Sequence, residues 1–161
     1  WDIGALGGLG FLDVRYLDGF PTAVEFKPDG TRMYFTGGIT DSIYQFDLAT
    51  PWDVTFSSSG TPTAFSIAAD TPSPLGIRFK PDDGTKMYLL NDSVSGALQE
   101  LNEYTLSTGW DVTTATFTRS FTGVGLNARF PKGVYFQDDG RTFYIIASYI
   151  NRIFTYSIGE Q

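Results

Sequence analysis

The sequence contains no cysteine and no histidine among its 161 residues. A zinc site built on thiolates or imidazoles is therefore excluded. Cysteine nucleophiles and catalytic triads that use histidine as the base are excluded for the same reason. No disulfide can form, although the lack of cysteine leaves the cellular compartment open. We expect no metal ion and no other cofactor.

Positive charge is scarce as well, with 11 Lys and Arg against 18 Asp and Glu and a net charge of −7 at pH 7. Proteins that bind nucleic acid need a basic surface for the phosphates, so a nucleic-acid partner is excluded. The same charge argues against binding to an anionic membrane surface. The longest apolar runs are far too short to cross a bilayer as a helix, so we expect no membrane insertion.

Aromatic residues, in contrast, are abundant: they make up 16% of the chain, within 42% hydrophobic residues. Such residues suit the half-buried, pleated surface of β-strands. No segment of useful length shows the helical period. Since a chain of 161 residues can bury a real core, we expect one all-β domain.

One phrase occurs three times along the chain. Pro-Thr-Ala-Val-Glu-Phe-Lys-Pro-Asp-Gly starts at Pro21, and closely related phrases start at Pro74 and Pro131. The spacings between these prolines are 53 and 57 residues. A regular internal repeat of this length indicates a fold built from copies of one supersecondary unit.

A second phrase, Trp-Asp followed by Val or Ile, marks each repeat at Trp52, Trp110 and Trp1. Trp52 and Trp110 each stand four residues after the last apolar residue of a strand-like segment. Counting from Ile158 past the last residue and on to Trp1 also gives four, if the two ends are joined. The sequence thus closes on itself in register as three whole repeats, approximately 21–73, 74–130 and 131–161 plus 1–20.

Each repeat contains four short segments with the composition and alternation of strands. An Asp-Gly pair between the first two segments is a strong hairpin signal. Four strands in about 50 residues are typical of one β-propeller blade. In the first repeat the expected strands are Ala23–Phe26, Arg32–Thr36, Ser42–Leu48 and Thr63–Ile67, and the fourth strands of the other repeats are Thr116–Phe121 and Phe11–Tyr16.

The phrase Phe-Lys-Pro-Asp-Gly-Thr-x-Met-Tyr resembles the first hairpin of the broad propeller superfamily that includes the YVTN, NHL and WD40-like repeats. The Thr-Pro-Trp-Asp-Val segment is similar to uncharacterised propeller repeats of phage and environmental bacterial proteins. The resemblance covers nearly the whole chain. It implies a propeller fold and says almost nothing about function.

Three blades are too few to close a propeller, which typically has about 4–8. We expect an N-terminal strand over Phe11–Tyr16 to close the last blade beside Ile153–Ile158. Two chains would then join head to tail in a homo-oligomeric, six-bladed ring, and such rings could stack into filaments. In the alternative, the chain is one unit of a longer tandem polypeptide with the same joint made covalently. The residues expected at the joint are Trp1, Phe11, Val14, Tyr16, Ile153, Tyr156 and Ile158.

Several conspicuous residues favour a structural interpretation. The acidic turns at Asp29, Asp82-Asp83 and Asp138-Asp139 lack the alternating carboxylates of a calcium loop, so they indicate hairpin geometry. The tryptophans recur at one fixed position, which indicates packing between the third and fourth strands rather than stacking on a sugar. On the innermost strand, Glu25 and Arg78 occupy equivalent positions, and we expect adjacent blades to bring them together as a partly buried ion pair.

Positions that differ between the repeats are better candidates for function, because the fold does not dictate them. The connections at one end of the blades carry polar and aromatic residues suited to a glycan or protein partner. Asn91 also begins a formal glycosylation sequon, and its use stays open. The candidate binding face consists of Thr40, Asp41, Asp92, Ser93, Ser95, Tyr149, Asn151, Arg152, Asn127 and Arg129.

These observations favour a non-enzymatic structural or assembly module, a fibre or filament component of an extracellular or virion surface. The first alternative is a carbohydrate-binding, lectin-like propeller. The second is a propeller enzyme that uses the channel carboxylates Glu25 or Glu103.

Overall fold

The computed structural model describes residues 10–55, 61–92, 99–124, 131–137, 140–148 and 150–158. These residues form three antiparallel sheets and one short 3₁₀ turn, η1 (Val112–Thr114). No helix in this part of the chain is long and apolar enough to cross a membrane.

The first two sheets have four strands each, hydrogen-bonded in sequence order. The first sheet consists of β1 (Pro21–Phe26), β2 (Arg32–Gly37), β3 (Ser42–Asp47) and β4 (Thr63–Ser66). The second consists of β5 (Pro74–Phe79), β6 (Lys86–Asn91), β7 (Glu100–Leu106) and β8 (Ala115–Phe121). The third has three strands, β9 (Pro131–Phe136), β10 (Thr142–Ala147) and β11 (Arg152–Ser157).

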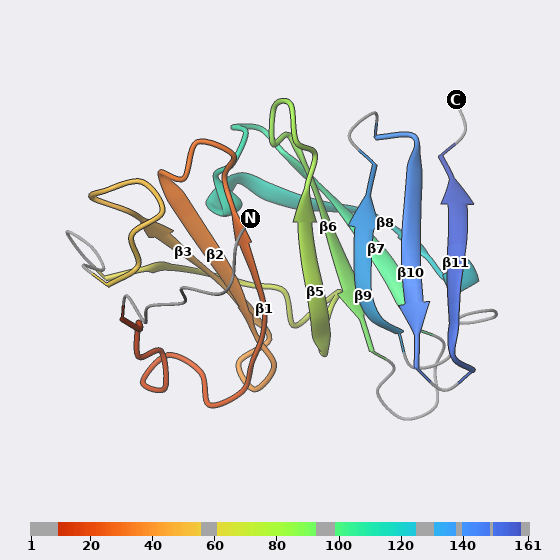
Figure 1. Cartoon of the computed structure of the whole chain (residues 1–161), viewed down its shortest axis with the longest axis horizontal. Helices are drawn as coiled ribbons and strands as arrows, with labels where there is room; N and C mark the ends of the chain where they lie inside the picture. The colour runs from red at the N-terminus through yellow and green to blue at the C-terminus, as the bar shows by residue number, and fades with distance from the viewer. Residues whose placement is uncertain are drawn as a thin grey trace, which may run out of the picture.

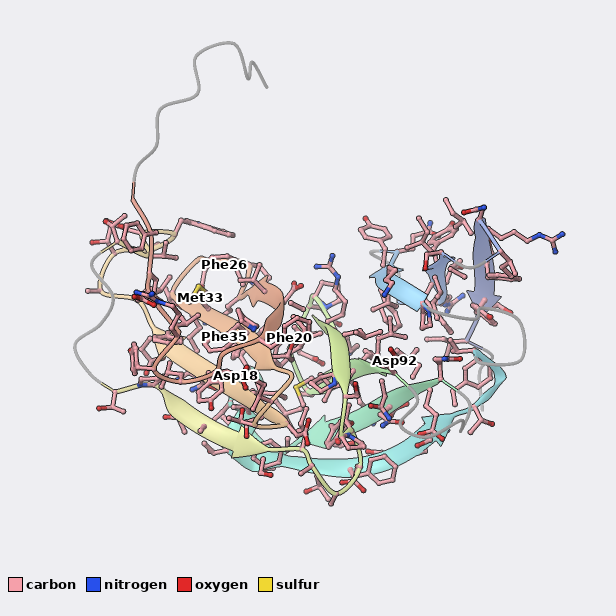
Figure 2. The ribbon with its side chains drawn as sticks, turned by 90° about the horizontal axis from the view of Figure 1, so that it is seen from below. Asp18, Phe20, Phe26, Met33, Phe35 and Asp92 are labelled. Atoms are coloured by element: carbon pink, nitrogen blue, oxygen red, sulfur yellow. The ribbon has the colours of Figure 1, made fainter. Side chains whose placement is uncertain are left out.

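The sheets stand side by side around an arc (Figure 1). Their first strands line its inner side, where β1 lies beside β5 and β5 beside β9. Figure 2 shows β4 and β8 on the convex side. This arrangement of successive four-stranded units is propeller-like, as the sequence predicts.

The Asp-Gly turns give the first hairpin of each blade its geometry. Gly30 and Gly84 have φ of 73° and 62°, a left-handed conformation that glycine adopts without strain. The Asp29 carboxylate accepts hydrogen bonds from the Thr31 amide and hydroxyl, at 2.9 and 2.6 Å. Asp83 binds Thr85 in the same way. The hairpin interpretation is confirmed for these turns, and Asp138-Asp139 lie outside the described residues.

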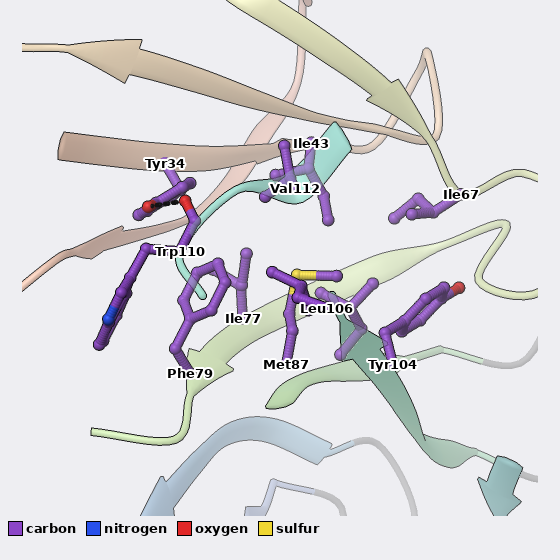
Figure 3. Close-up of a cluster of buried hydrophobic side chains, with 11 residues drawn as sticks. Tyr34, Ile43, Ile67, Ile77, Phe79, Met87, Tyr104, Leu106, Trp110 and Val112 are labelled. Atoms are coloured by element: carbon purple, nitrogen blue, oxygen red, sulfur yellow. Dashed lines mark hydrogen bonds between the residues drawn. The ribbon is translucent and has the colours of Figure 1, made fainter. Parts of the chain in front are cut away.

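The main core lies between the first and second sheets (Figure 3). Trp110, which is 8% exposed, packs there against Phe79 with a ring separation of 5.2 Å. Its carbonyl accepts a hydrogen bond of 2.6 Å from the Tyr34 hydroxyl across the two sheets. The Val112 amide donates to Gln45 Oε1 at 3.0 Å, again between the sheets. The packing role predicted for the tryptophans is therefore confirmed at this position.

The expected strand over Phe11–Tyr16 is not formed in this chain. Residues 10–20 contain no strand, and Leu12, Val14 and Leu17 pack on the apolar face of the first sheet around Met33 and Phe35. A strand needs a neighbouring edge, and β11, its expected partner, belongs to the sheet at the other end of the arc. Within the described residues the third sheet therefore has three strands instead of four.

Asp18 fastens this N-terminal segment to the first sheet. It is 3% exposed, and its carboxylate accepts hydrogen bonds from the Phe20, Ile39 and Thr40 amides and from the Thr40 hydroxyl. Burial acts to raise the pKa of Asp18, but these four donors outweigh it and hold the pKa below the ordinary value of an aspartate.

Replacing Asp18 with Ala should lower the free energy of unfolding by about 2 kcal/mol, because buried donors lose their acceptor. The wild type should lose this contribution as pH falls from about 4 through the lower pKa of the folded carboxyl, and Asp18→Ala should lack that part of the pH dependence. Urea titrations at pH 7 and between pH 4 and 2 measure both effects. Asp47→Ala is the control: the Asp47 side chain is 68% exposed, so the loss of its ion pair with Arg32 should cost no more than about 0.5 kcal/mol.

Candidate functional site

Most described residues of the proposed binding face form hydrogen bonds or turns within the chain. Thr40 is bound to Asp18, and Asp41 and Asn151 adopt left-handed turn conformations with φ of 48° and 51°. Asp92 accepts a 3.3 Å hydrogen bond from Gln99, and Arg152 begins β11 as an exposed residue. The other members of the predicted face, Ser93, Ser95, Asn127, Arg129 and Tyr149, lie outside the described residues. A ligand for this face stays a prediction.

A different set of side chains meets on the inner side of the arc. A cavity of about 250 Å³ spans β1, β5 and β9, the first strands of the three sheets. Thr22, Arg78 and Lys132 are the polar residues in its lining, among small and aliphatic neighbours. Two cations thus face one hollow in a protein whose net charge is −7.

Arg78 joins all three sheets at this hollow. Its guanidinium forms an ion pair with Glu25 on β1, and its Nε donates to the Val134 carbonyl on β9 at 3.3 Å. The Glu25 side chain is 16% exposed and that of Arg78 39%. The partly buried pair predicted from the sequence is confirmed, because adjacent blades place equivalent positions of their first strands side by side.

The protonation of Glu25 depends on two opposing effects. Burial raises the pKa of this carboxyl, and the Arg78 guanidinium lowers it through its charge and its hydrogen bond. Burial is the larger effect, so the pKa of Glu25 lies above the ordinary value of a glutamate. A carboxylate with a raised pKa is a stronger base than an exposed one, and such groups occur in catalytic sites.

Glu103, the other carboxylate named from the sequence, does not lie on an inner strand. It belongs to β7, the third strand of its sheet, and binds Lys86 at 2.8 Å and Arg119 at 3.1 Å. Its repeat position corresponds to Gln45, which holds the seam between the sheets. Glu103 is therefore not a carboxylate of the channel, and that prediction is wrong.

Lys132 is the residue of the inner hollow that sequence reasoning did not select. It directly follows Pro131, where the other repeats have Thr22 and Leu75. Comparing the repeats position by position would have marked it, because a cation replaces uncharged residues on the strand that lines the channel. Among the described residues no group of three or more acidic side chains could hold a metal ion.

No protein-family model matches this sequence, and no curated protein matches it either. Solved structures do resemble it. Two proteins provisionally assigned as 6-phosphogluconolactonases, from Bacteroides fragilis and Bacteroides uniformis, match with TM-scores of 0.60 and 0.58, at 17% and 22% identity. A protein from Lactobacillus plantarum matches with a TM-score of 0.58 at 15% identity.

These matches cover 85%, 86% and 85% of this chain but only 34%, 37% and 37% of the solved chains. The chain thus spans about a third of the length of the proteins that it resembles. At these identities the likeness establishes a shared propeller-like fold and nothing further. None of these three proteins comes from a phage.

The comparisons overturn the expectation of a non-enzymatic structural module. The similar structures include the two proteins provisionally assigned as enzymes, and none of the three supports a fibre, filament or adhesive role. The lectin-like alternative also receives no support. The absence of His and Cys does not exclude an enzyme, because carboxylate, guanidinium and ammonium groups remain available for catalysis.

The Glu25–Arg78 pair should stabilise the contact between the first two sheets. Glu25→Gln should lower the free energy of unfolding by about 1–2 kcal/mol, between the values for an exposed and a fully buried pair. Lys80→Gln is a control, because Lys80 binds Asp82 and Asp83 in an exposed turn and should cost no more than about 0.5 kcal/mol. Equal urea midpoints for Glu25→Gln and the wild type would show that the pair contributes nothing.

Proposed function

We propose that this chain supplies part of the channel-side site of a propeller hydrolase that opens a phosphorylated sugar lactone. The observation that carries the proposal is the hollow over β1, β5 and β9, where Arg78 and Lys132 face one cavity beside Glu25. The names of the two Bacteroides proteins suggest the substrate class.

Each of the three groups suits one requirement of lactone hydrolysis. Glu25, with its raised pKa, accepts a proton from the water that attacks the lactone carbonyl. Arg78 donates to the carbonyl oxygen as negative charge develops, since its guanidinium carries more N–H donors than its two partners use. The ring C–O bond then breaks, the ring oxygen takes up the proton, and the product is the open hydroxy acid.

Lys132 is assigned to the substrate phosphate. It is an exposed ammonium at the cavity, and its β9 neighbours Gly133 and Val134 present no acidic side chain there. A phosphate is attracted by a point charge of this kind. Lys132 therefore determines affinity for the phosphorylated substrate, while Glu25 and Arg78 act on the carbonyl.

One chain walls only part of such a channel, because propellers close with about 4–8 blades. We propose that a second copy of the chain supplies the remaining wall, so that two chains form a six-bladed ring. The exposed apolar groove of about 410 Å³ on the outer face of the first sheet, which Leu12, Met33 and Phe35 help to line, supports this arrangement. In water, a groove of this kind favours burial against a partner.

Kinetics with 6-phosphogluconolactone test the roles. Glu25→Gln should lower kcat by about 100-fold or more, and Lys132→Met should raise KM with little change in kcat. The Lys132→Met effect should disappear with the lactone that lacks phosphate. Lys27→Met and Asp47→Asn, both in exposed ion pairs away from the hollow, should behave as the wild type. A wild type without hydrolytic activity, or a fully active and folded Glu25→Gln variant, would refute the proposal.

The pH profile gives a second test. Activity should rise with pH as Glu25 loses its proton, with a midpoint above the ordinary glutamate value. Arg78→Met should move the midpoint to still higher pH, because it removes the cation that favours the carboxylate. The control Arg15→Met, at a fully exposed site, should leave the midpoint in place. If the wild type and Arg78→Met have the same midpoint, the group that titrates is not Glu25.

A further inference from the structure

A groove of about 400 Å³ opens between the second and third sheets. Its lining is mainly apolar and aromatic, and it includes Tyr88, Leu101, Glu103, Phe136, Phe143 and Ile158. Stacked aromatic rings, such as Tyr88 on Phe136 at 4.4 Å, form its floor.

The repeat shows what such a groove holds. The equivalent positions between the first and second sheets are Tyr34, Ile43, Gln45, Phe79, Met87 and Leu106. There the space is filled by Trp110 and Val112, which belong to the same buried cluster (Figure 3). The filling segment is held by Tyr34, which donates to the Trp110 carbonyl, and by Gln45, which accepts from the Val112 amide. Tyr88 and Glu103 stand at the corresponding places in the second groove.

We infer that this groove is the docking site for residues 1–14 of a second copy of this chain, with the Trp1 side chain as its anchor. Trp1-Asp2-Ile3 repeats the Trp110-Asp111-Val112 pattern that fills the first groove. Tyr88 would donate to the Trp1 carbonyl, and Glu103 would accept from the Ile3 amide. The inference deepens the proposed two-chain ring and is independent of the proposed hydrolase chemistry.

The described part of the segment fixes the register of the joint. The Val14 carbonyl accepts hydrogen bonds from the Leu17 and Asp18 amides, just as the Ile67 carbonyl accepts from Asp70 and Thr71. Val14 is therefore equivalent to Ile67, and Leu12 to Phe65. Both equivalent pairs also pack in the same way: Leu12 and Val14 on the core of the first sheet, and Phe65 and Ile67 on that of the second.

This equivalence predicts the partners on β11. Phe65 pairs with Ile43 in the first sheet, so Leu12 should lie opposite Ile153 of the other copy. Asp13 should then lie opposite Arg152, where Ser66 faces Ser42 in the first sheet. The two charges are complementary, and opposite charges on facing strands stabilise the pairing.

The spacing from the tryptophan gives the same register when it is taken from the second repeat, whereas the first repeat has two more residues between Trp52 and Phe65. Phe121 follows Trp110 by eleven residues and pairs with Leu101, and Leu12 follows Trp1 by the same interval. Leu101 is equivalent to Ile153 in the repeat. Both counts therefore place Leu12 opposite Ile153.

Apolar side chains at the two ends of the arc are exposed, as expected if the contact with a second copy is absent from a single chain. Phe11 and Ile153 are 82% and 68% exposed, and Trp52 is 57% exposed where the equivalent Trp110 is 8% exposed. Residues 10–17 lie against the first sheet, and the second sheet separates them from β11. A second copy satisfies both ends at once, because its first sheet carries the segment to the third sheet of its neighbour.

Engineered disulfides test this in the full-length chain, which has no cysteine of its own. Leu12→Cys and Ile153→Cys, made in separate chains and mixed under oxidising conditions, should cross-link into a species of twice 17.7 kDa. Arg15→Cys mixed with Ile153→Cys is the control for register and should not cross-link. Native mass spectrometry of the wild type should give the same doubled mass.

Two outcomes would overturn the inference. A wild-type monomer, with no cross-link in the mixture, would remove the second copy from the groove. A chain carrying both Leu12→Cys and Ile153→Cys that cross-links within itself at the monomer mass would assign the groove to the chain's own N-terminus. Neither readout uses enzymatic activity, so a failure here is distinct from a failure of the hydrolase proposal.

The anchor has its own test. Trp1→Ala should raise the dissociation constant of the two-chain species by at least tenfold, and Trp1→Phe should recover part of the loss. Ile39→Ala, at a position that is 67% exposed in a connection of the first sheet, should leave it unchanged. If the Leu12–Ile153 cross-link forms but Trp1→Ala has no effect, the groove is not the site of Trp1, and that part of the inference is wrong.

Discussion

Each sheet of this protein is stabilised by packing against the next one along the chain. A blade here has apolar side chains on both of its faces, so it needs a neighbour on each side. Between the first two sheets this need is met by a continuous cluster that includes Tyr34, Met87 and Trp110. Polar contacts also direct the packing: the Trp110 carbonyl accepts from the Tyr34 hydroxyl and the Arg32 guanidinium, and the Val112 amide donates to Gln45. Since a buried carbonyl without a donor is costly, these bonds make the seam specific as well as apolar.

The same packing creates the candidate site. Because the sheets fan out from their first strands, β1, β5 and β9 come side by side although they begin 53 and 57 positions apart in the sequence. Glu25 and Arg78 then meet as a partly buried ion pair in which burial raises the pKa of the carboxyl, and Arg78 also lines the cavity over these strands. Desolvation therefore has two effects at one place: it makes the pair costly to break, and it gives Glu25 the character of a base.

The proposed two-chain ring follows from the need of each sheet for a neighbour on both of its faces. In the arc of three sheets, the first and third sheets each have a neighbouring sheet on one side only (Figure 1). The solved chains that it resembles are more than twice as long as this chain. In this chain the N-terminal segment covers part of the face of its own first sheet, where Leu12 and Val14 occupy the places that Phe65 and Ile67 take at the next seam.

Local structure could be predicted from the sequence: eleven of the strands, the Asp-Gly hairpins at Asp29 and Asp83, and the packing position of Trp110. These follow from period-two alternation and turn chemistry, which act over a few residues. The sequence also indicated the Glu25–Arg78 pair, because equivalent positions of a repeat become neighbours. Three features could be seen only in the folded chain: Lys132 lines the same hollow as Arg78, Glu103 lies at a seam, and residues 10–17 pack on the first sheet without forming a strand. Those outcomes depend on which sheets are adjacent and which edges are available, and no pattern along a single strand contains that information.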